Sequence, residues 1–292
     1  MEQEDWLARE FEDHRPHLRA VAYRMLGSLT EADDAVQDAW LRLTRADRSD
    51  VENLRAWLTT VVARVALNML RSRNTRREQP LDVHVPDPVV GSADGTDPEH
   101  EVLLADSVGL ALLVVLETLS PAERLAFVLH DTFGVPFDDI APLVQRSPEA
   151  ARQLASRARR RVRGAVPSPD ADLPAQWEIV EAFESAARNG DFDALVAVLD
   201  PDVVLRADGG ATGLSRHLRG ADAVAGQALL WSRTDLVLRR ALVNGTPGTV
   251  AIRDGRPFSV GAFTVRNGRI VEIDFLADPD RVAQLQLNVL DD

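Results

Sequence analysis

The stretch from Phe137 to Val162, FDDIAPLVQRSPEAARQLASRARRRV, has the pattern of two short helices joined by a tight turn. The first helix carries three apolar residues on one face: Ile140, Leu143 and Val144. A polar turn follows at Gln145. Ser147 before Pro148 is typical of a helix start, because serine accepts a hydrogen bond from the first-turn amides and proline lacks the N–H that would have no partner. The stretch therefore predicts a helix-turn-helix.

The second helix of this motif divides its residues between faces. Small and apolar residues recur at core spacing: Ala151, Leu154, Ala155 and Ala158. The other faces carry polar and basic residues: Arg152, Gln153, Ser156, Arg157 and Arg160. A recognition helix needs this division, since one stripe anchors it while arginine and glutamine reach base edges and phosphates in the major groove. The alternative is an arginine-rich, solvated helix end, which the helix dipole also favours.

The net charge of −13 over 292 residues argues at first against nucleic acid. The charge is uneven, however, because residues 1–77 and 104–165 are close to neutral. The acidic excess lies in residues 78–103 and in the C-terminal third. All 33 basic residues are arginine, which binds phosphate and guanine with two parallel hydrogen bonds. DNA binding by the two near-neutral segments therefore stays open.

Composition also excludes several kinds of site. The chain has no cysteine, which excludes disulfides, thiol catalysis and thiolate metal sites, and its six histidines lack ligand spacing. We expect no metal and no cofactor. We find no pattern of a signal peptide and no apolar stretch long enough to span a membrane, so we expect no membrane contact and a cytoplasmic location.

The N-terminal part has the periodicity of a small helical bundle. Apolar residues recur at helical spacing over 16–45 and 54–70, with a break at Gly27. Thr30 followed by Asp33 has the spacing of a capping pair and predicts the start of the second helix. The bundle is expected within residues 1–77. Residues 78–103 are rich in Pro, Gly, Asp and Ser without any periodic pattern, and they predict a linker.

The pattern changes class in the last third of the chain. Helical spacing over 104–165 is followed by a second linker at 166–174 and then by a domain over 175–292. That domain begins with two helices and continues in alternating apolar segments, with a further helix near 222–231. The expected strands are 203–207, 236–243, 248–253, 257–266 and 269–276. Three dipeptides typical of hairpin turns separate the last four: Asn244-Gly245, Asp254-Gly255 and Asn267-Gly268. This is an α+β pattern with a meander sheet.

The N-terminal segment resembles region 2 of the RNA polymerase sigma factors. Two stretches carry the resemblance, YRMLGS at Tyr23–Ser28 and EADDAVQDAWL at Glu31–Leu41. In the family, the acidic helix docks on the clamp helices of the largest polymerase subunit. The resemblance assigns this contact to five residues: Asp33, Asp34, Gln37, Asp38 and Leu41. Carboxylates and glutamine on one exposed face suit an arginine-rich partner helix, and an ordinary solvated helix face is the alternative.

The stretch Trp57–Arg71 resembles the region 2 helix that supports opening of the minus-ten promoter element. The resemblance implies DNA contacts from Arg64, Asn68, Arg71 and Arg73. It also implies that the loop 47–53 accepts a flipped base, which needs a shaped pocket. Arg64 and Asn68 stand where many relatives carry Asn and Asp, so the base preference does not transfer. Trp57 fits a core position better than a stacking role.

The stretch Leu116–Leu129 resembles the start of sigma region 4 and leads directly into the helix-turn-helix. By position, Arg124 would contact phosphate. The residues that would face the minus-thirty-five element are Arg152, Gln153, Ser156 and Arg157. The short connection between the two blocks leaves no room for a full region 3. The resemblance therefore indicates a minimal, extracytoplasmic-function sigma factor that binds core RNA polymerase and promoter DNA and is no enzyme.

The C-terminal domain resembles the SnoaL-like group of the nuclear-transport-factor-2-like fold, a cone in which a curved antiparallel sheet wraps around helices. The stretches that carry this resemblance are Phe192–Leu195, Leu199–Val204, Asp208–Gly210 and Ile270–Phe275. A sigma factor with such an extension is similar to the sigma-J-like subgroup, in which the extension regulates activity in cis through contact with the sigma domains. That subgroup has an Asp-Gly-Gly-Gly motif and a Trp-Leu-Pro-Glu-Pro linker. Here Asp208, Gly209 and Gly210 are followed by Ala211, and the linker is Val83–Pro88 (VHVPDP).

The same cone also builds enzymes, whose pockets use a carboxylate base and an oxyanion donor. Asp208, Asp274 and His217 are the candidates for such a role. The single tyrosine, Tyr23, lies outside the domain, so the tyrosine donor of some isomerases on this fold is absent. We therefore favour regulatory docking through Asp208, Gly209 and Gly210 over ligand sensing or catalysis. A cyclase-like enzyme with a DNA-binding arm and a helix-turn-helix repressor that never meets polymerase remain alternatives.

Overall fold

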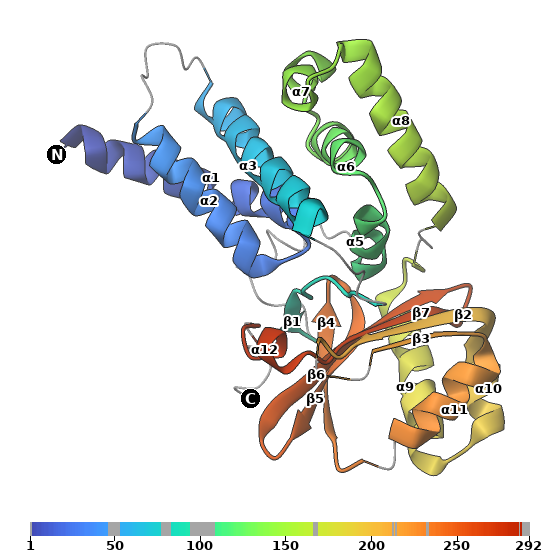
Figure 1. The fold of residues 1–292 in the computed structure, drawn as a ribbon. Coiled ribbons are helices and arrows are strands. Elements are labelled where there is room, and N and C mark those ends of the chain that lie inside the picture. Colours follow the sequence, from blue (N-terminus) through green and yellow to red (C-terminus); the bar gives the residue numbers. More distant parts are fainter. Residues whose placement is uncertain are drawn as a thin grey trace. The chain divides into compact units, whose positions relative to one another are not determined.

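The computed structural model describes residues 2–45, 53–76, 83–93, 109–165, 169–211, 213, 215–231, 234–285 and 287. The chain forms two compact units, one from residues 1–80 and 115–165 and the other from 81–114 and 166–292 (Figure 1). No helix in these described ranges is long and apolar enough to cross a membrane. The same ranges contain no group of three or more His, Asp or Glu side chains arranged to hold a metal ion.

The first unit begins with three packed helices, which confirms the predicted bundle. These are α1 (Glu2–Leu26), α2 (Leu29–Leu43) and α3 (Leu54–Arg76). Gly27 has a φ of +69° and ends α1, and Ser28 then caps α2 by accepting a hydrogen bond from the Glu31 N–H at 3.4 Å. The predicted capping pair of Thr30 with Asp33 is therefore wrong. The glycine turn starts the helix earlier, which places Thr30 inside its first turn.

The helix-turn-helix completes the first unit. The motif consists of α7 (Phe137–Val144) and α8 (Pro148–Ala165). It follows α6 (Pro121–Phe127) and a short π-helix, η2 (Val128–Thr132), in the same unit. Before them comes α5 (Leu110–Glu117), whose first residues belong to the second unit and whose last belong to the first. The first motif helix begins at Phe137 and ends before the predicted turn at Gln145, and the predicted cap by Ser147 is confirmed, since its Oγ accepts from the Ala150 N–H at 3.3 Å. Gln145 makes the turn in the left-handed region at φ +56°. No pattern in the sequence predicts the π-helix.

The second unit is built on a seven-stranded sheet in the order β1-β4-β5-β6-β7-β2-β3. The strands are β1 (Val90–Ser92), β2 (Leu199–Asp208), β3 (Arg216–Arg219), β4 (Val237–Val243), β5 (Thr246–Arg253), β6 (Arg256–Arg266) and β7 (Arg269–Leu276). Both residues of each predicted hairpin dipeptide have positive φ, which confirms the meander from β4 to β7. The sheet is mixed, because β2 pairs with β7 in parallel. These two strands are joined through a helix and four other strands, so no hairpin forces them to run antiparallel.

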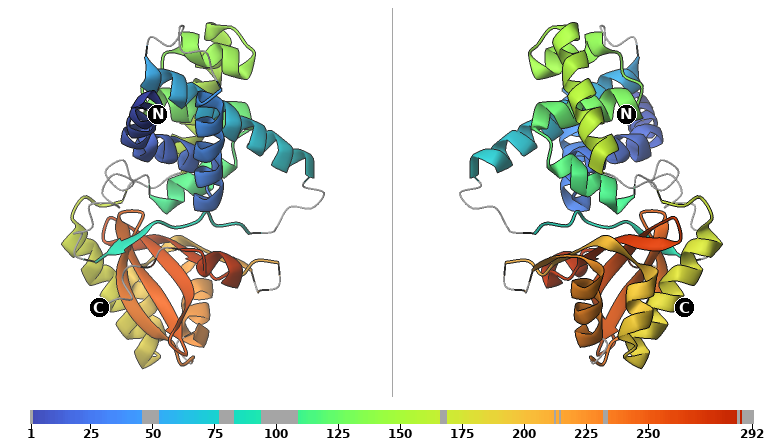
Figure 2. Two further views of the ribbon diagram at one scale, coloured as in Figure 1. Left: turned by 90° about the vertical axis from the view of Figure 1, so that its left-hand side faces the viewer. Right: turned by 90° about the vertical axis from the view of Figure 1, so that its right-hand side faces the viewer.

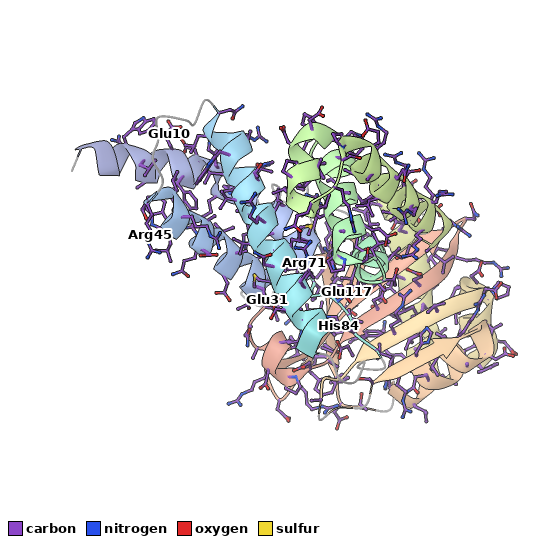
Figure 3. All side chains as sticks on the ribbon, turned by 45° about the horizontal axis from the view of Figure 1, so that its top comes forward. Glu10, Glu31, Arg45, Arg71, His84 and Glu117 are labelled. Atoms are coloured by element: carbon purple, nitrogen blue, oxygen red, sulfur yellow. The ribbon has the colours of Figure 1, made fainter. Side chains whose placement is uncertain are left out.

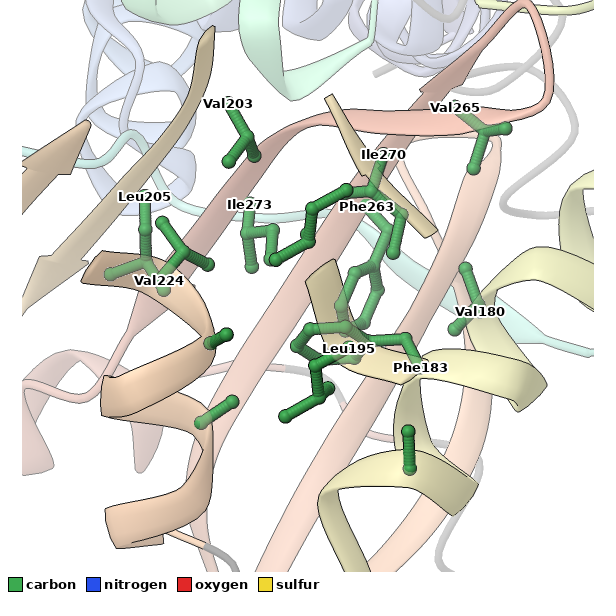
Figure 4. Close-up of a cluster of buried hydrophobic side chains, with 14 of the residues drawn as sticks. Val180, Phe183, Leu195, Val203, Leu205, Val224, Phe263, Val265, Ile270 and Ile273 are labelled. Carbon is green, nitrogen blue, oxygen red and sulfur yellow. The ribbon is translucent and has the colours of Figure 1, made fainter. Parts of the chain in front are cut away.

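Three helices cover one face of this sheet, and the hydrophobic core of the unit lies between these helices and the sheet. They are α9 (Leu173–Asn189), α10 (Phe192–Val198) and α11 (Ala221–Trp231), and both views of Figure 2 show them on the same side. Figure 4 shows the buried side chains between the layers, among them Phe183 and Leu195 from the helices and Leu205, Phe263 and Ile273 from the strands. Each such side chain contributes about 1.5–3 kcal/mol when fully buried. A short helix, α12 (Pro279–Val282), ends the described fold.

Residues 83–93, expected to be linker without secondary structure, are part of the second unit. Strand β1 pairs with β4 over Val90–Ser92. Apolar side chains of this segment are buried: Val83, Val85, Val89 and Val90. The sequence shows no strand here because the ordered pairing is three residues long and follows two prolines, and because the partner strand lies about half the chain away. The segment is therefore an edge of the C-terminal domain.

Candidate DNA-binding surfaces and regulatory site

Helix α8 presents the predicted DNA-reading residues together. Its anchor is the fully buried stripe of Ala151, Ala155 and Ala158. The four predicted contacts are all exposed: Arg152, Gln153, Ser156 and Arg157. Because successive residues turn by about 100° around a helix, Gln153 and Ser156 lie opposite the alanine stripe and the two arginines flank them. Exposed Arg160 falls on the same outward face, and sequence reasoning left it out of the predicted site although its spacing indicates this position.

Two further arginines of α8 hold the helix in place. Arg159 lies 2.6 Å from an Asp131 carboxylate oxygen in η2, and Arg161 lies 3.4 Å from Glu123 in α6. The hydrogen bond to Asp131 raises the pKa of Arg159. Some arginines of α8 therefore fix the helix to its neighbours, and others form its exposed basic surface. The number of arginines alone does not distinguish these two roles.

Arg124 is buried, with 3% of its surface exposed. Its Nε donates to the backbone carbonyl of Arg24 in α1 at 3.0 Å. Burial lowers the pKa of Arg124 to about 10. Next to it the Arg24 guanidinium lies over the Phe133 ring at 4.9 Å, and the His17 ring meets the same phenyl edge-on. In this conformation Arg124 joins α6 to α1 and does not reach the surface, in contrast to the predicted phosphate contact.

The predicted polymerase-binding residues lie on one side of α2. Asp33, Asp34 and Gln37 are exposed, Asp38 is half-buried, and Leu41 keeps 43% of its surface exposed, which is high for a leucine. Asp33 accepts from Arg19 Nε at 2.8 Å and Asp38 from Arg42 at 3.0 Å. These are surface pairs worth about 0–1 kcal/mol each, so a partner's basic groups can replace them at little cost.

The predicted minus-ten contacts on α3 divide into two groups. Arg64, Asn68 and Arg71 are exposed at positions i, i+4 and i+7 of one helix face, and Figure 3 shows Arg71 on this helix. Arg73 instead donates to Glu31 Oε1 through Nε and to the Leu26 carbonyl through Nη1, both at 3.0 Å, and so ties α3 to the α1–α2 turn. Most of the loop 47–53 lies outside the described residues. Trp57 is half-buried.

Asp208 is the centre of a buried network in the second unit. It keeps only 2% of its surface exposed at the end of β2. Its Oδ2 accepts from the Val85 backbone N–H at 3.0 Å, from His84 Nδ1 at 3.2 Å and from Arg281 Nη1 at 2.9 Å, and its Oδ1 accepts from the Gly210 N–H at 3.0 Å. Burial opposes the charge, but these hydrogen bonds and the Arg281 charge outweigh it and lower the pKa of Asp208 to about 2.

Arg281 joins this network from α12 and was not predicted. Its Nε donates to Asp87 Oδ1 at 2.8 Å and its Nη2 donates to the Val85 carbonyl at 2.6 Å. Asp278 accepts from the Arg281 N–H at 3.3 Å and caps α12. The pair Asp278-Pro279 is a recognisable helix start, but no local signal shows which side chain of so short a helix reaches the segment at 83–93.

Asn244 holds the segment at 83–93, and Gly210 allows the close packing of the Asp208–Gly210 motif. Asn244 exchanges two hydrogen bonds with Val89, at 3.0 Å through its side-chain oxygen and at 2.8 Å through its backbone N–H. Gly210 has a φ of +69°, and a Cβ there would lie 2.1 Å from an Asp278 carboxylate oxygen. The Gly209 N–H donates to Ser215 Oγ at 3.3 Å. The motif thus needs glycine at 210 to let α12 approach.

The residues considered for catalysis do not form one site. Asp274 is buried and pairs with Arg206 at 2.7 Å, as does Glu272 at 3.1 Å. Burial raises the pKa of Asp274 even though Arg206 opposes this effect. Asp208 is engaged by the segment at 83–87, and His217 is exposed on β3. Asp208 and Asp274 are therefore equally buried but held by different partners, whereas His217 is exposed.

Comparison with known proteins follows the division into modules. Residues 11–76 match the family model described as Sigma-70 region 2, and residues 109–162 match the model described as Sigma-70, region 4. These matches define the α1–α3 bundle and the helix-turn-helix as the two promoter-recognition modules of a sigma-70-type initiation factor.

Relatives extend the likeness to the full chain. ECF RNA polymerase sigma factor SigJ of Mycobacterium tuberculosis is 42% identical over 93% of this chain and 92% of its own length. A probable ECF RNA polymerase sigma factor SigI of the same species is 38% identical over 98% of each chain. The crystal structure of M. tuberculosis SigJ aligns over 96% of this chain and all of that chain, with a TM-score of 0.76 and 36% identity.

The chain belongs to the extracytoplasmic-function (ECF) RNA polymerase sigma factor family. It acts in promoter-directed transcription initiation and not as an enzyme. The predicted resemblance to the sigma-J-like subgroup is confirmed, together with the fold of two helical sigma domains and a SnoaL-like α+β domain. The alternatives of a cyclase-like enzyme and of a repressor that never meets polymerase are therefore wrong.

Proposed function

We propose that three exposed surfaces make different contacts during transcription initiation. The exposed face of α2 around Asp33, Gln37 and Leu41 binds core RNA polymerase. The α3 face of Arg64, Asn68 and Arg71 contacts the minus-ten element. The outward face of α8, residues 152–160, reads the minus-thirty-five element. Support comes from the exposure of each set on one side of one helix, since a contact surface must be presented by a rigid element. The chain would act in the cytoplasm, where core polymerase is found.

We further propose that the C-terminal domain, residues 175–292, regulates this activity in cis. The observation that supports this is the capture of residues 83–93 by Asp208, Arg281 and Asn244. Residues 83–93 lie between the two promoter-recognition modules in the sequence, so the chain that joins these modules runs through the captured segment. Fixing residues 83–93 on the C-terminal domain removes them from the tether and so limits the separations that the two modules can reach. Contact of the domain with the sigma modules would add to this restraint.

Run-off transcription with purified core polymerase tests both proposals. We expect promoter-specific transcripts from the full chain, and the absence of a transcript from every promoter, including that of its own gene, would refute the proposed division of surfaces. Arg281→Met should release the segment and change the transcript yield without changing affinity for core polymerase. The matched control is Arg219→Met, because Arg219 and its partner Asp202 are both exposed. Removal of residues after 166 should likewise preserve core binding. Unchanged output from both the Arg281 variant and the truncation would refute cis regulation.

A further inference from the structure

Arg152, on the flank of the outward face of α8, lies over an aromatic ring. Its Cζ is 5.3 Å from the ring centroid of Phe137, the first residue of α7. The imidazole of His130 stacks on the same phenyl ring, with the centroids 3.9 Å apart and the planes inclined by 30°. The three side chains come from η2, α7 and α8, which follow one another in the chain, and α7 packs against both of the others. Figure 1 shows α7 beside α8. We call His130 and Phe137 the ring pair.

The ring pair is itself held in place. His130 Nδ1 lies 3.1 Å from the carbonyl oxygen of Val135, and because a carbonyl only accepts, this nitrogen carries the proton and donates. His130 belongs to the π-helix η2, whose wider turn is a local departure of the kind often found at functional sites. Both rings are half-buried, whereas Arg152 is exposed. A fixed support therefore lies beneath an exposed cation.

We propose that the ring pair positions Arg152 for reading the upstream promoter element. This inference rests on the proposed role of α8. A free arginine side chain on a helix samples many rotamers, and ordering it on DNA costs conformational entropy. Stacking over Phe137 restricts the rotamers of Arg152 before DNA binds, so less entropy is lost on binding. The contact uses the face of the guanidinium, so its N–H edges stay free to donate to guanine O6 and N7.

Two other arginines of α8 are held in a different way. Arg159 and Arg161 are held by the carboxylates of Asp131 and Glu123, which accept hydrogen bonds from the guanidinium N–H groups. An arginine held in that way has fewer donors for a base. Arg152 is restrained through its face and keeps the donors that recognition needs, and it lies within the first turns of the helix that enters the groove.

The test uses holoenzyme assembled from the full chain and purified core polymerase. Promoters are selected from DNA randomised at the upstream element with wild type, Phe137→Leu, Arg152→Gln and the double variant. Leucine keeps an apolar residue at the start of α7 but removes the aromatic face. We expect Phe137→Leu to relax preference at the base pair that Arg152→Gln also relaxes, by about two- to fivefold. It should have no further effect when Arg152 is already replaced.

Matched variants separate positioning from a general structural effect. Phe137→Tyr should restore the wild-type preference, and Phe137→Leu combined with Arg160→Gln should show independent effects. His130→Ala, which removes the support and leaves the phenyl ring, should relax the same base pair to a smaller extent and serves if Phe137→Leu fails to fold. Uniform loss of transcription with unchanged preferences, or additivity with Arg152→Gln, overturns the inference. If Arg152→Gln itself changes no preference, the proposed role of Arg152 in reading DNA fails first.

Discussion

Arg281→Met is the sharpest test of how residues 83–93 are held. Methionine keeps much of the apolar stem but removes every donor to Asp87, Asp208 and the Val85 carbonyl. Two buried carboxylates then lose their cation, and removing one partner of a buried ion pair costs about 3–5 kcal/mol. Because the Arg281 side chain keeps 22% of its surface exposed, we expect the lower end, about 3 kcal/mol.

A second estimate from Asp208 agrees with this value. Lowering its pKa from 3.8 to about 2 corresponds to about 2 kcal/mol in favour of the ionised form. Only part of this comes from Arg281, since His84 and the N–H groups of Val85 and Gly210 contribute as well. The lost hydrogen bonds to Asp87 and to the Val85 carbonyl add about 1–1.5 kcal/mol each. The sum again lies near 3 kcal/mol.

Native-state hydrogen exchange measures the consequence directly. A loss of about 3 kcal/mol raises the open population of the segment about 100-fold, and the Val85 and Val89 amides should exchange faster by that factor. Arg219→Met should change their exchange by less than about threefold, because an exposed ion pair contributes little. Exchange of the Val85 amide in Arg281→Met within threefold of wild type would refute the reasoning, since the amide would then be protected by something other than this network.

Three further outcomes test the local physics. The stability advantage of wild type over Asp208→Asn, about 2 kcal/mol at neutral pH, should disappear as the pH falls from about 4 to about 2. The unfolded chain takes up the proton before the folded one does, and denaturant titrations across this range measure the effect. Gly210→Ala should cost about 2–3 kcal/mol, from left-handed backbone strain and the clash with Asp278. Gly190→Ala, with similar φ and open space around the Cβ, should show the strain alone in thermal unfolding. Ser120→Ala removes the capping box of α6 and should lower the stability of the first unit by about 1 kcal/mol in urea unfolding.

The parts of the fold that follow from local chemistry were predictable. Asn-Gly and Asp-Gly dipeptides adopt positive φ at low cost, so the three hairpins could be located by residue. Serine before proline marked the start of α8, and the turn at Gln145 ended α7 where the apolar pattern stops. The exposed set on α8 followed from helical spacing once an apolar stripe was assigned to the core, whereas the set on α2 came from the resemblance to region 2.

The parts that depend on distant partners were not predictable. Arg124 matches a surface position by its place in a motif, but it is buried because a carbonyl 100 residues earlier accepts its hydrogen bond. Strand β1 exists because β4 offers an edge, and Arg281 acts at 83–87 because α12 lies against the glycine at 210. Hydrogen bonds of this kind join positions with no shared periodicity, so no pattern within either segment encodes them.

The departures from the sigma-J-like linker and motif have a common physical explanation. The linker here is VHVPDP in place of Trp-Leu-Pro-Glu-Pro, yet Asp208 and Arg281 engage its backbone, at the Val85 N–H and carbonyl. Main-chain contacts of this kind tolerate a change of side chain. Two linker side chains are also used. His84 donates to Asp208, and Asp87, which keeps the acidic character of the subgroup's glutamate, pairs with Arg281. Ala211 follows the glycine that the close approach of Asp278 requires, so the fourth position of the motif can change while the third cannot. What must be preserved for docking is therefore a carboxylate at 208, a glycine at 210 and a cation at 281.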